Sequence, residues 1–167
     1  MEIVDMLKRT DIFYDLPEPQ LVLMASLCEE HPVKFGDLVF EENSIGDEMY
    51  VIVRGSVEVL VDPTIVGGPT AKEHDTGPVT IATLRAGQTF GEIALVDQGL
   101  RTASARCAEI DTQLLAIHRE KFNKLCDTYP ELGYRVMRNI AADLSFKIRG
   151  SDLAIREQLL WRPRSMA

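Results

Sequence analysis

The spacing of hydrophobic residues changes twice along this chain. Residues 1–30 contain two segments with helical spacing, EIVDMLKR and PEPQLVLMASLCEE, and the second places Leu21, Met24, Ala25 and Cys28 on one face, with its prolines in the first turn. Residues 31–118 instead contain runs rich in β-branched and aromatic residues, which predict strands: VKFGDLVF, EMYVIVRG, SVEVLVD, VTIATLRAG and SARCAEIDTQLLAIH. Helical spacing returns in residues 119–162.

This order predicts an α+β fold in one domain. Short strands separated by turn residues at intervals of about ten residues are typical of an antiparallel, jelly-roll-like β-roll. We therefore expect N-terminal helices in residues 1–30, a β-roll in residues 31–118 and C-terminal helices in residues 119–162. The length of 167 residues suits a single domain.

Turn residues mark the connections of the predicted roll. Gly36, Asn43, Gly46 and Gly55 lie where a reversing chain needs left-handed or closely packed backbone. Residues 62–78 contain prolines, a Gly pair and a polar centre, which predicts a long hairpin loop. We expect this loop to be mobile and to carry no chemistry.

The C-terminal helical region carries one apolar stripe. Its members are Met137, Ala141, Leu144, Ile148, Ile155 and Leu159. Gly150-Ser151 interrupts the stripe and predicts a hinge or a break, because Gly costs about 1 kcal/mol relative to Ala in a helix. The stripe could pair two chains through their last helices, and burial against the roll would explain the half before Gly150 equally well. The half after it, with Trp161 near its end, is expected to be a contact surface and to support a homodimer.

The net charge of −8 is unevenly distributed. Residues 1–133 hold 11 Lys and Arg against 23 Asp and Glu, whereas residues 134–167 hold 7 against 3. A body this acidic argues against nucleic acid as a partner. The basic residues near the C-terminus are expected to form a solvated helix face.

Neither a membrane nor an oxidising compartment is indicated. No apolar run approaches the roughly 20 residues of a membrane span, and the N-terminus lacks the layout of a signal peptide. Cys28, Cys107 and Cys126 are odd in number and lack CxxC spacing. We expect them to be reduced core thiols of a cytoplasmic protein, with Cys107 on a strand.

The segment FGEIALVDQGLRTAS, residues 90–104, has the composition of an anion site. One helical turn at GEIAL, held by the roll, would direct the amides of Glu92, Ile93 and Ala94 outward, where they attract negative charge. Gly91 would let a ligand approach the backbone closely.

The second half of this segment supplies the charge. Arg101 offers a planar fork that can take two phosphate oxygens. Thr102 and Ser104 can add hydroxyl donors, with the small Ala103 between them. A carboxylate beside a phosphate site would repel the phosphate. Because a carboxylate only accepts hydrogen bonds, it is favourable there only if the ligand offers it a hydrogen-bond donor. Glu92 therefore indicates a sugar hydroxyl next to the phosphate, as in a ribose phosphate.

FGEIAL followed by RTAS closely resembles the phosphate-binding cassette of cyclic nucleotide-binding domains. Such domains occur in regulatory subunits of cyclic-nucleotide-dependent protein kinases, in gated cation channels and in the bacterial catabolite activator. The resemblance extends through residues 10–160, where KFGDLVFEENSIGDEMYVIVRGSVEV is similar to the Gly-rich first half of the family. Asn43 stands where Gly is usual, and Asn tolerates the same left-handed backbone.

The resemblance implies a β-roll flanked by helices and a role for each cassette residue. Glu92 would contact the ribose 2′-hydroxyl and Arg101 the cyclic phosphate, with the amides of residues 91–94 completing the site. In this family a Thr beside the cassette Arg accompanies cyclic GMP (cGMP) recognition in kinases, yet similar channels with that Thr respond to cyclic AMP (cAMP). Thr102 therefore decides little, and we expect cAMP ahead of cGMP.

The family also closes its final helix over the base. In this chain that implies residues 147–155 as a lid, with Lys147, Ile148 and Arg149 just before Gly150. The alternative is that Ile148 packs in the core and Arg149 is solvated.

The predicted function is a stand-alone cyclic nucleotide sensor that acts through an unknown effector protein, or else a fragment of a longer protein. Only four residues follow Pro163, too few for a helix-turn-helix. One alternative is a degenerate roll that binds nothing and serves as a dimerisation module. Another is that Glu92 and Arg101 form a surface ion pair.

An enzyme, a metal and a cofactor are not expected. A metal-dependent jelly roll needs two His one residue apart and a further ligand, whereas His31, His74 and His118 are scattered. No Ser-His-Asp or Cys-His constellation stands out from spacing.

Overall fold

The computed structural model describes residues 3–62 and 77–160. The centre of the predicted loop at 62–78 and Trp161 lie outside these residues, as do the side chains of Ile155 and Leu159.

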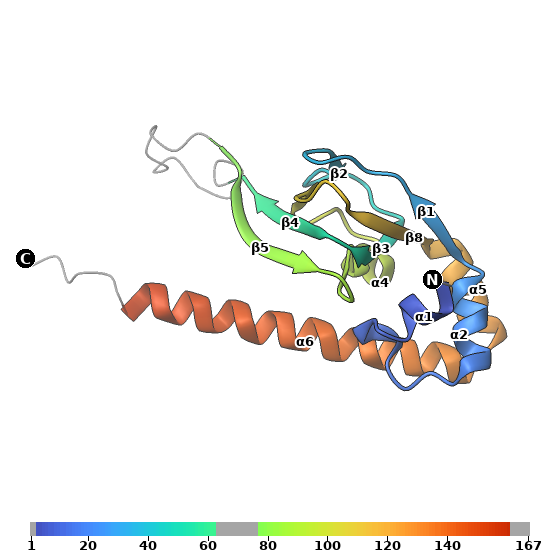
Figure 1. The fold of residues 1–167 in the computed structure, drawn as a ribbon. Helices are drawn as coiled ribbons and strands as arrows, with labels where there is room; N and C mark the ends of the chain where they lie inside the picture. Colours follow the sequence, from blue (N-terminus) through green and yellow to red (C-terminus); the bar gives the residue numbers. More distant parts are fainter. Residues whose placement is uncertain (1–2, 63–76, 161–167) are drawn as a thin grey trace, which may run out of the picture.

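In the described residues, two antiparallel sheets of four strands each form the predicted β-roll (Figure 1). The first has the order β1-β8-β3-β6 and contains Cys28–His31, Gln113–His118, Glu48–Arg54 and Thr89–Phe90. The second has the order β2-β7-β4-β5 and contains Leu38–Phe40, Ser104–Cys107, Ser56–Val61 and Val79–Arg85. The α+β fold class is thereby confirmed.

Strand β3 is buried on both faces, which explains its continuous apolar sequence. Met49 and Val51 point into a core shared with the helices, whereas Tyr50 and Ile52 point into the interior of the roll. Successive side chains of a strand alternate between faces, so a strand sandwiched between two layers needs apolar residues at every position. Strand β3 thus separates the helical layer from the interior where the cassette lies.

The N-terminal helices are α1 (Ile3–Leu7), the 3-10 helix η1 (Asp11–Phe13) and α2 (Glu18–Ala25). Pro19 lies in the first turn of α2, as predicted. The helix ends at Ala25, however, and Cys28 begins strand β1, so the predicted extension of helical spacing to residue 30 is wrong. Backbone pairing of Cys28 with Ile117 of β8 places this segment in the sheet, and tertiary pairing overrides the local helical pattern.

The C-terminal region forms α5 (Arg119–Thr128) and α6 (Pro130–Leu160), and α6 runs along the roll (Figure 1). Helix α6 continues through Gly150 and Ser151, so the predicted break does not occur. An added Cβ at Gly150 would meet no atom within 4 Å, so packing does not require Gly there. A hinge at Gly150 stays a prediction.

The predicted stripe is not the face of α6 that packs. Among the described side chains of α6, the buried apolar ones are Leu132, Val136 and Ile140, which belong to the core formed with the N-terminal helices. Met137 and Ile148 are exposed, and among the described side chains of the stripe only Leu144 packs partly against the core. Burial of this half of the stripe against the roll is therefore wrong for Met137 and Ile148, whereas pairing of two chains through it stays a prediction. Among the described residues, no helix has the length and apolarity required to cross a bilayer.

The three cysteines carry free thiols, and Cys107 is buried on β7 as predicted. Burial raises the pKa of Cys28 to about 12. Burial, with a contribution from the charge of Asp127, raises the pKa of Cys126 to about 11. Folding favours the neutral form of Cys28 and Cys126. Their contribution to the free energy of unfolding is therefore fully present below the ordinary pKa of 9.0, and it is lost as the pH rises through about 11 for Cys126 and about 12 for Cys28.

These thiols should react slowly in the folded protein. Only the thiolate is nucleophilic, so alkylation of Cys126 by iodoacetamide at pH 8 should be about a hundredfold slower than that of an unperturbed thiol, with Cys28 slower still. Mass spectrometry before and after unfolding in denaturant measures this difference. Equal rates in the folded and unfolded protein would contradict the expectation.

Candidate functional site

Helix α4, Glu92–Asp97, follows strand β6 and forms the short helix predicted at GEIAL. Gly91 precedes it with φ +79°, a left-handed conformation that favours Gly. Ile93 is exposed, whereas Glu92 and Ala94 are buried. The first amides of a helix have no acceptor within it, so this turn offers backbone donors.

Backbone contacts with residues 43–45 hold Arg101 in place. The Asn43 N–H donates to the Arg101 carbonyl at 2.8 Å, and the Arg101 N–H donates to the Ser44 carbonyl at 2.9 Å. Ile45 and Leu100 form an antiparallel bridge beside them. Asn43 has φ +64°, so it adopts the left-handed backbone expected of it.

The Arg101 side chain turns into the roll and is 5% exposed. Nη1 donates to the Gly91 carbonyl at 3.1 Å and Nη2 to the Glu48 carbonyl at 2.7 Å. The guanidinium carbon lies 4.0 Å from the centre of the Phe40 ring, within range of a cation–π contact. Nε is buried without a partner among the described residues.

Burial shifts the pKa of Arg101, and neighbouring groups oppose the shift. Burial lowers the pKa, while Tyr50, Glu48, Asp47 and Glu92 act in the opposite direction. An Arg side chain nevertheless stays charged in proteins. The site therefore holds a desolvated positive charge.

Gly46 lacks a side chain where the Arg101 guanidinium packs against it, a role that the position of Gly46 in a turn did not predict. A Cβ at Gly46 would overlap Nε and Cζ of Arg101. At Gly91 a Cβ would lie 2.6 Å from Arg101 Nη1 and 3.1 Å from the Glu48 carbonyl. Spacing along the sequence could not reveal this, because Gly46 and Arg101 meet only through the backbone pairing of their two loops.

Glu92 is 3% exposed, and its two carboxylate oxygens differ in their surroundings. Oε1 accepts a hydrogen bond from Lys147 Nζ at 2.7 Å. Oε2 is buried and has no partner among the described residues. Glu92 and Arg101 are both buried and are not paired with each other, so the surface ion pair considered from the sequence is wrong.

Lys147 reaches the site from α6. Its Nζ also donates to the Thr89 carbonyl at 3.0 Å and forms an ion pair with Asp143 at 2.8 Å. Burial lowers the pKa of Lys147, but the nearby charges and hydrogen bonds of Glu92 and Asp143 outweigh burial and raise the pKa above its ordinary value. Lys147 is therefore a charged part of the site rather than a solvated residue of a basic face.

The other predicted site residues differ in their exposure and in their contacts with the cassette. Thr102 is exposed, Ala103 is buried, and the Ser104 Oγ accepts a hydrogen bond from the Glu42 N–H at 2.9 Å. Ile148 and Arg149 are exposed on α6, so of the three predicted lid residues only Lys147 contacts the cassette. A lid role for Ile148 and Arg149 stays a prediction.

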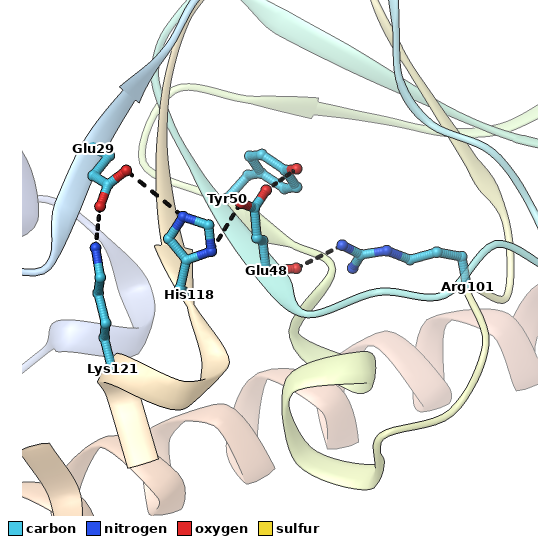
Figure 2. A network of polar contacts seen from close by, with 6 residues as sticks. All are labelled: Glu29, Glu48, Tyr50, Arg101, His118 and Lys121. Atoms are coloured by element: carbon cyan, nitrogen blue, oxygen red, sulfur yellow. Dashed lines mark hydrogen bonds and ion pairs between the residues drawn. The ribbon is translucent and has the colours of Figure 1, made fainter. Parts of the chain in front are cut away.

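A polar network connects the Arg101 site to the start of α5 (Figure 2). The carbonyl of Glu48 accepts from Arg101, while its carboxylate accepts from Tyr50 Oη at 2.6 Å and contacts His118 Nδ1 at 2.9 Å. His118 Nε2 lies 3.6 Å from Glu29, which also contacts Lys121. Burial, then the hydrogen bond to Glu48, raises the pKa of Tyr50.

The sequence profile described as "Cyclic nucleotide-binding domain" matches residues 30–129. The chain belongs to the cyclic nucleotide-binding domain family. The match includes strands β2 to β8, the cassette and α5, so the resemblance predicted from FGEIAL and RTAS is confirmed.

Several relatives of the family are similar to this chain. A cGMP-dependent protein kinase of Drosophila melanogaster is 35% identical over 136 residues, which is 80% of this chain and 14% of the kinase. The Cyclic AMP receptor protein of Thermus thermophilus is 31% identical over 149 residues, 89% of this chain and 62% of that protein. The chain therefore spans less than two thirds of the length of these relatives.

A solved cyclic nucleotide-binding domain from Methylobacillus flagellatus has the same fold. It superposes with a TM-score of 0.78 at 22% identity, covering 99% of this chain and 85% of the other. This likeness supports the architecture of the roll with its flanking helices, including α6.

Proposed function

We propose that the roll binds cAMP or cGMP at the cassette. Arg101 contacts the cyclic phosphate, Glu92 accepts a hydrogen bond from the ribose 2′-hydroxyl, and the amides of residues 91–94 complete the site, with Thr102, Ala103 and Ser104 beside them. The supporting observation is a buried guanidinium and a buried carboxylate on either side of Gly91, each with one unpartnered polar atom among the described residues. Buried polar atoms without partners are uncommon and mark places where a ligand can supply the missing hydrogen bond.

The base is left open between adenine and guanine. The relatives include a cGMP-dependent protein kinase and a Cyclic AMP receptor protein, so similarity to known proteins favours neither cGMP nor cAMP as the ligand. Thr102 is exposed and available to a base. We keep cAMP as the first ligand to test.

The output of binding is a change in the position of α6 that a partner protein reads. A ligand shifts such an equilibrium only through its different affinity for the two positions. Helix α6 is suited to this role because it contacts the cassette through Lys147 and extends beyond it. The proposed module is a cytoplasmic regulator without catalytic activity.

A second candidate function is dimerisation by a roll that binds no nucleotide. The exposed apolar residues Tyr134, Met137 and Ile148 on α6 favour it, since they could pair with a second copy. Homodimerisation is also compatible with nucleotide binding. Sedimentation that gives a monomer with and without nucleotide would remove the dimer.

Calorimetric titration with cAMP, cGMP and cyclic di-GMP tests the proposed function. We expect saturable heat with cAMP or cGMP and none with cyclic di-GMP, because the site offers one guanidinium for one phosphate. Heat with none of the three would favour the dimerisation module. Conversion of any of them to a product would instead indicate an enzyme.

A further inference from the structure

Glu48 contacts Arg101 through its backbone and two further ionisable residues through its side chain (Figure 2). Its carbonyl accepts a hydrogen bond from Arg101 Nη2 at 2.7 Å. Its Oε2 accepts from Tyr50 Oη at 2.6 Å, and its Oε1 lies 2.9 Å from His118 Nδ1. Both carboxylate oxygens are therefore engaged, and both contacts restrain the residue whose carbonyl positions the guanidinium.

His118, at the end of β8, lies between two carboxylates from different strands. Nδ1 faces Glu48 of β3, and Nε2 lies 3.6 Å from Glu29 of β1. The His118 side chain is 33% exposed, so it can exchange protons with solvent. The hydrogen bond and charge of Lys121 lower the pKa of Glu29, so this neighbour stays negative in mildly acidic solution. A protonated His118 would thus have a negative partner on each side.

Other charged groups surround His118 from three parts of the chain. Together with the two carboxylates already described, they are Asp47 just before β3, and Arg119, Glu120 and Lys121 on α5. Four of these six groups are acidic and two are basic, so a proton on His118 would offset part of a net negative charge. Glu48 and Asp47 also interact electrostatically with Arg101. Their negative charge therefore acts on the proposed phosphate site.

The charge of His118 changes what an anion meets at Arg101. With a neutral imidazole, the full negative charge of Glu48 acts against an incoming phosphate. With a protonated imidazole, the contact becomes an ion pair that offsets this charge. A charge-assisted hydrogen bond is also shorter and stronger than a neutral one, so it restrains Glu48 and the carbonyl that accepts from Arg101. Both effects favour an anion in the site.

We propose, building on the proposed function, that Glu48 is a positioning residue for Arg101 and that protonation of His118 tightens nucleotide binding. Imidazole is the side chain whose ordinary charge change falls between pH 5 and 8, and a cyclic phosphate keeps its single negative charge throughout this range. The proton and the nucleotide each favour the binding of the other by the same factor. The module would then respond to pH as well as to nucleotide.

Calorimetric titration with cAMP and cGMP at pH 5.5, 6.5 and 8.0 tests the effect of the proton. Wild type should bind about threefold tighter at pH 5.5 than at pH 8.0, because one charge acts on an anion across a short, partly screened distance. His118→Asn keeps a donor for Glu48 without the charge, and its affinity should not change with pH. His31→Asn is the matched control and should keep the wild-type dependence, because the His31 ring contacts Tyr50 rather than Glu48.

Proton uptake is a readout that a merely structural role of His118 would not change. Titrations at pH 6.5 in two buffers of different ionisation enthalpy give the number of protons bound together with the nucleotide. Wild type and His31→Asn should take up part of a proton, and His118→Asn none. The same uptake in His118→Asn as in wild type would overturn the role of this residue.

Glu48→Gln and Glu48→Ala separate positioning from charge, because both variants lack the carboxylate. Gln can still accept from Tyr50 and His118, whereas Ala cannot. At pH 8.0 we expect Glu48→Ala to bind nucleotide about fivefold more weakly than Glu48→Gln, which is the size of a typical net hydrogen-bond contribution. Thermal unfolding checks that both variants are folded. Equal binding by the two folded variants would remove the positioning role of the side chain.

The outcomes distinguish failure of the proton effect from failure of the proposed function. If wild type binds nucleotide equally well at all three pH values, the proposed function stands and the role of His118 is wrong. If neither wild type nor any variant binds nucleotide at any pH, the proposed function fails, and the coupling to His118 fails with it.

Discussion

Replacing Arg101 with Ala should weaken cyclic nucleotide binding by about 100-fold or more. The guanidinium is almost fully buried and lies between the Gly91 and Glu48 carbonyls. Truncating one partner of a buried, hydrogen-bonded charge pair costs about 2–5 kcal/mol, and each 1.4 kcal/mol is a factor of ten in affinity. Calorimetric titration of the variant with cAMP and cGMP measures the loss.

Two further variants make this result specific. Arg54→Ala removes an arginine whose ion pair with Asp111 is exposed, and it should leave binding unchanged. Arg101→Lys keeps the charge but loses the planar fork, so it should bind with intermediate affinity. Thermal unfolding of each variant must show a folded protein. Wild-type affinity in a folded Arg101→Ala protein would remove the phosphate role of this residue.

Replacing Gly46 with Ala should lower nucleotide affinity by about tenfold or more, although Gly46 carries no side chain to contact a ligand. The added Cβ would overlap the Arg101 guanidinium, which would have to leave its place over Phe40. Overpacking of this kind usually costs about 1–3 kcal/mol. Because the overlapping atoms belong to a side chain rather than to backbone, the protein should still fold with a displaced Arg101.

A double-mutant cycle identifies the cause of this loss. If Gly46→Ala acts by moving Arg101, it should add little to the effect of Arg101→Ala in the double variant. Gly77→Ala is the control, since a Cβ there would meet no atom within 4 Å. Additive losses in the double variant would mean that Gly46 contributes to binding by a route other than Arg101.

Much of the fold could be predicted because its signals are local. Strand β3 is apolar or aromatic from Met49 to Val53, strand β4 is rich in Val, and the turns at Gly36 and Gly55 have the positive φ that favours Gly. Strand β1 was missed, since Cys28–His31 has no strand pattern of its own and joins the sheet only through pairing with β8. Local patterns are least informative where pairing decides the structure.

The cassette likewise has some features that the sequence predicts and others that only the tertiary structure shows. FGEIAL and RTAS identify the family, the short helix and the two ionisable residues. They do not show that Arg101 would be enclosed by Gly46 and Phe40, which come from another part of the chain. They also led to the expectation that Glu92 awaits a donor from the ligand, whereas Lys147 of α6 already supplies one.

The sequence by itself determined the fold class, the family and the place of the cassette, because strand periodicity, turn residues and a contiguous motif are written into neighbouring positions. Only the tertiary structure decided which face of α6 is buried and which side chain meets Glu92. Helix α6 has more than one apolar face, and Val136 and Ile140 bury one of them against the N-terminal helices and α5. This packing directs Lys147 toward the roll and leaves Ile148 exposed. The contact between Lys147 and Glu92, which lie more than fifty residues apart in the chain, therefore follows from the packing of α6.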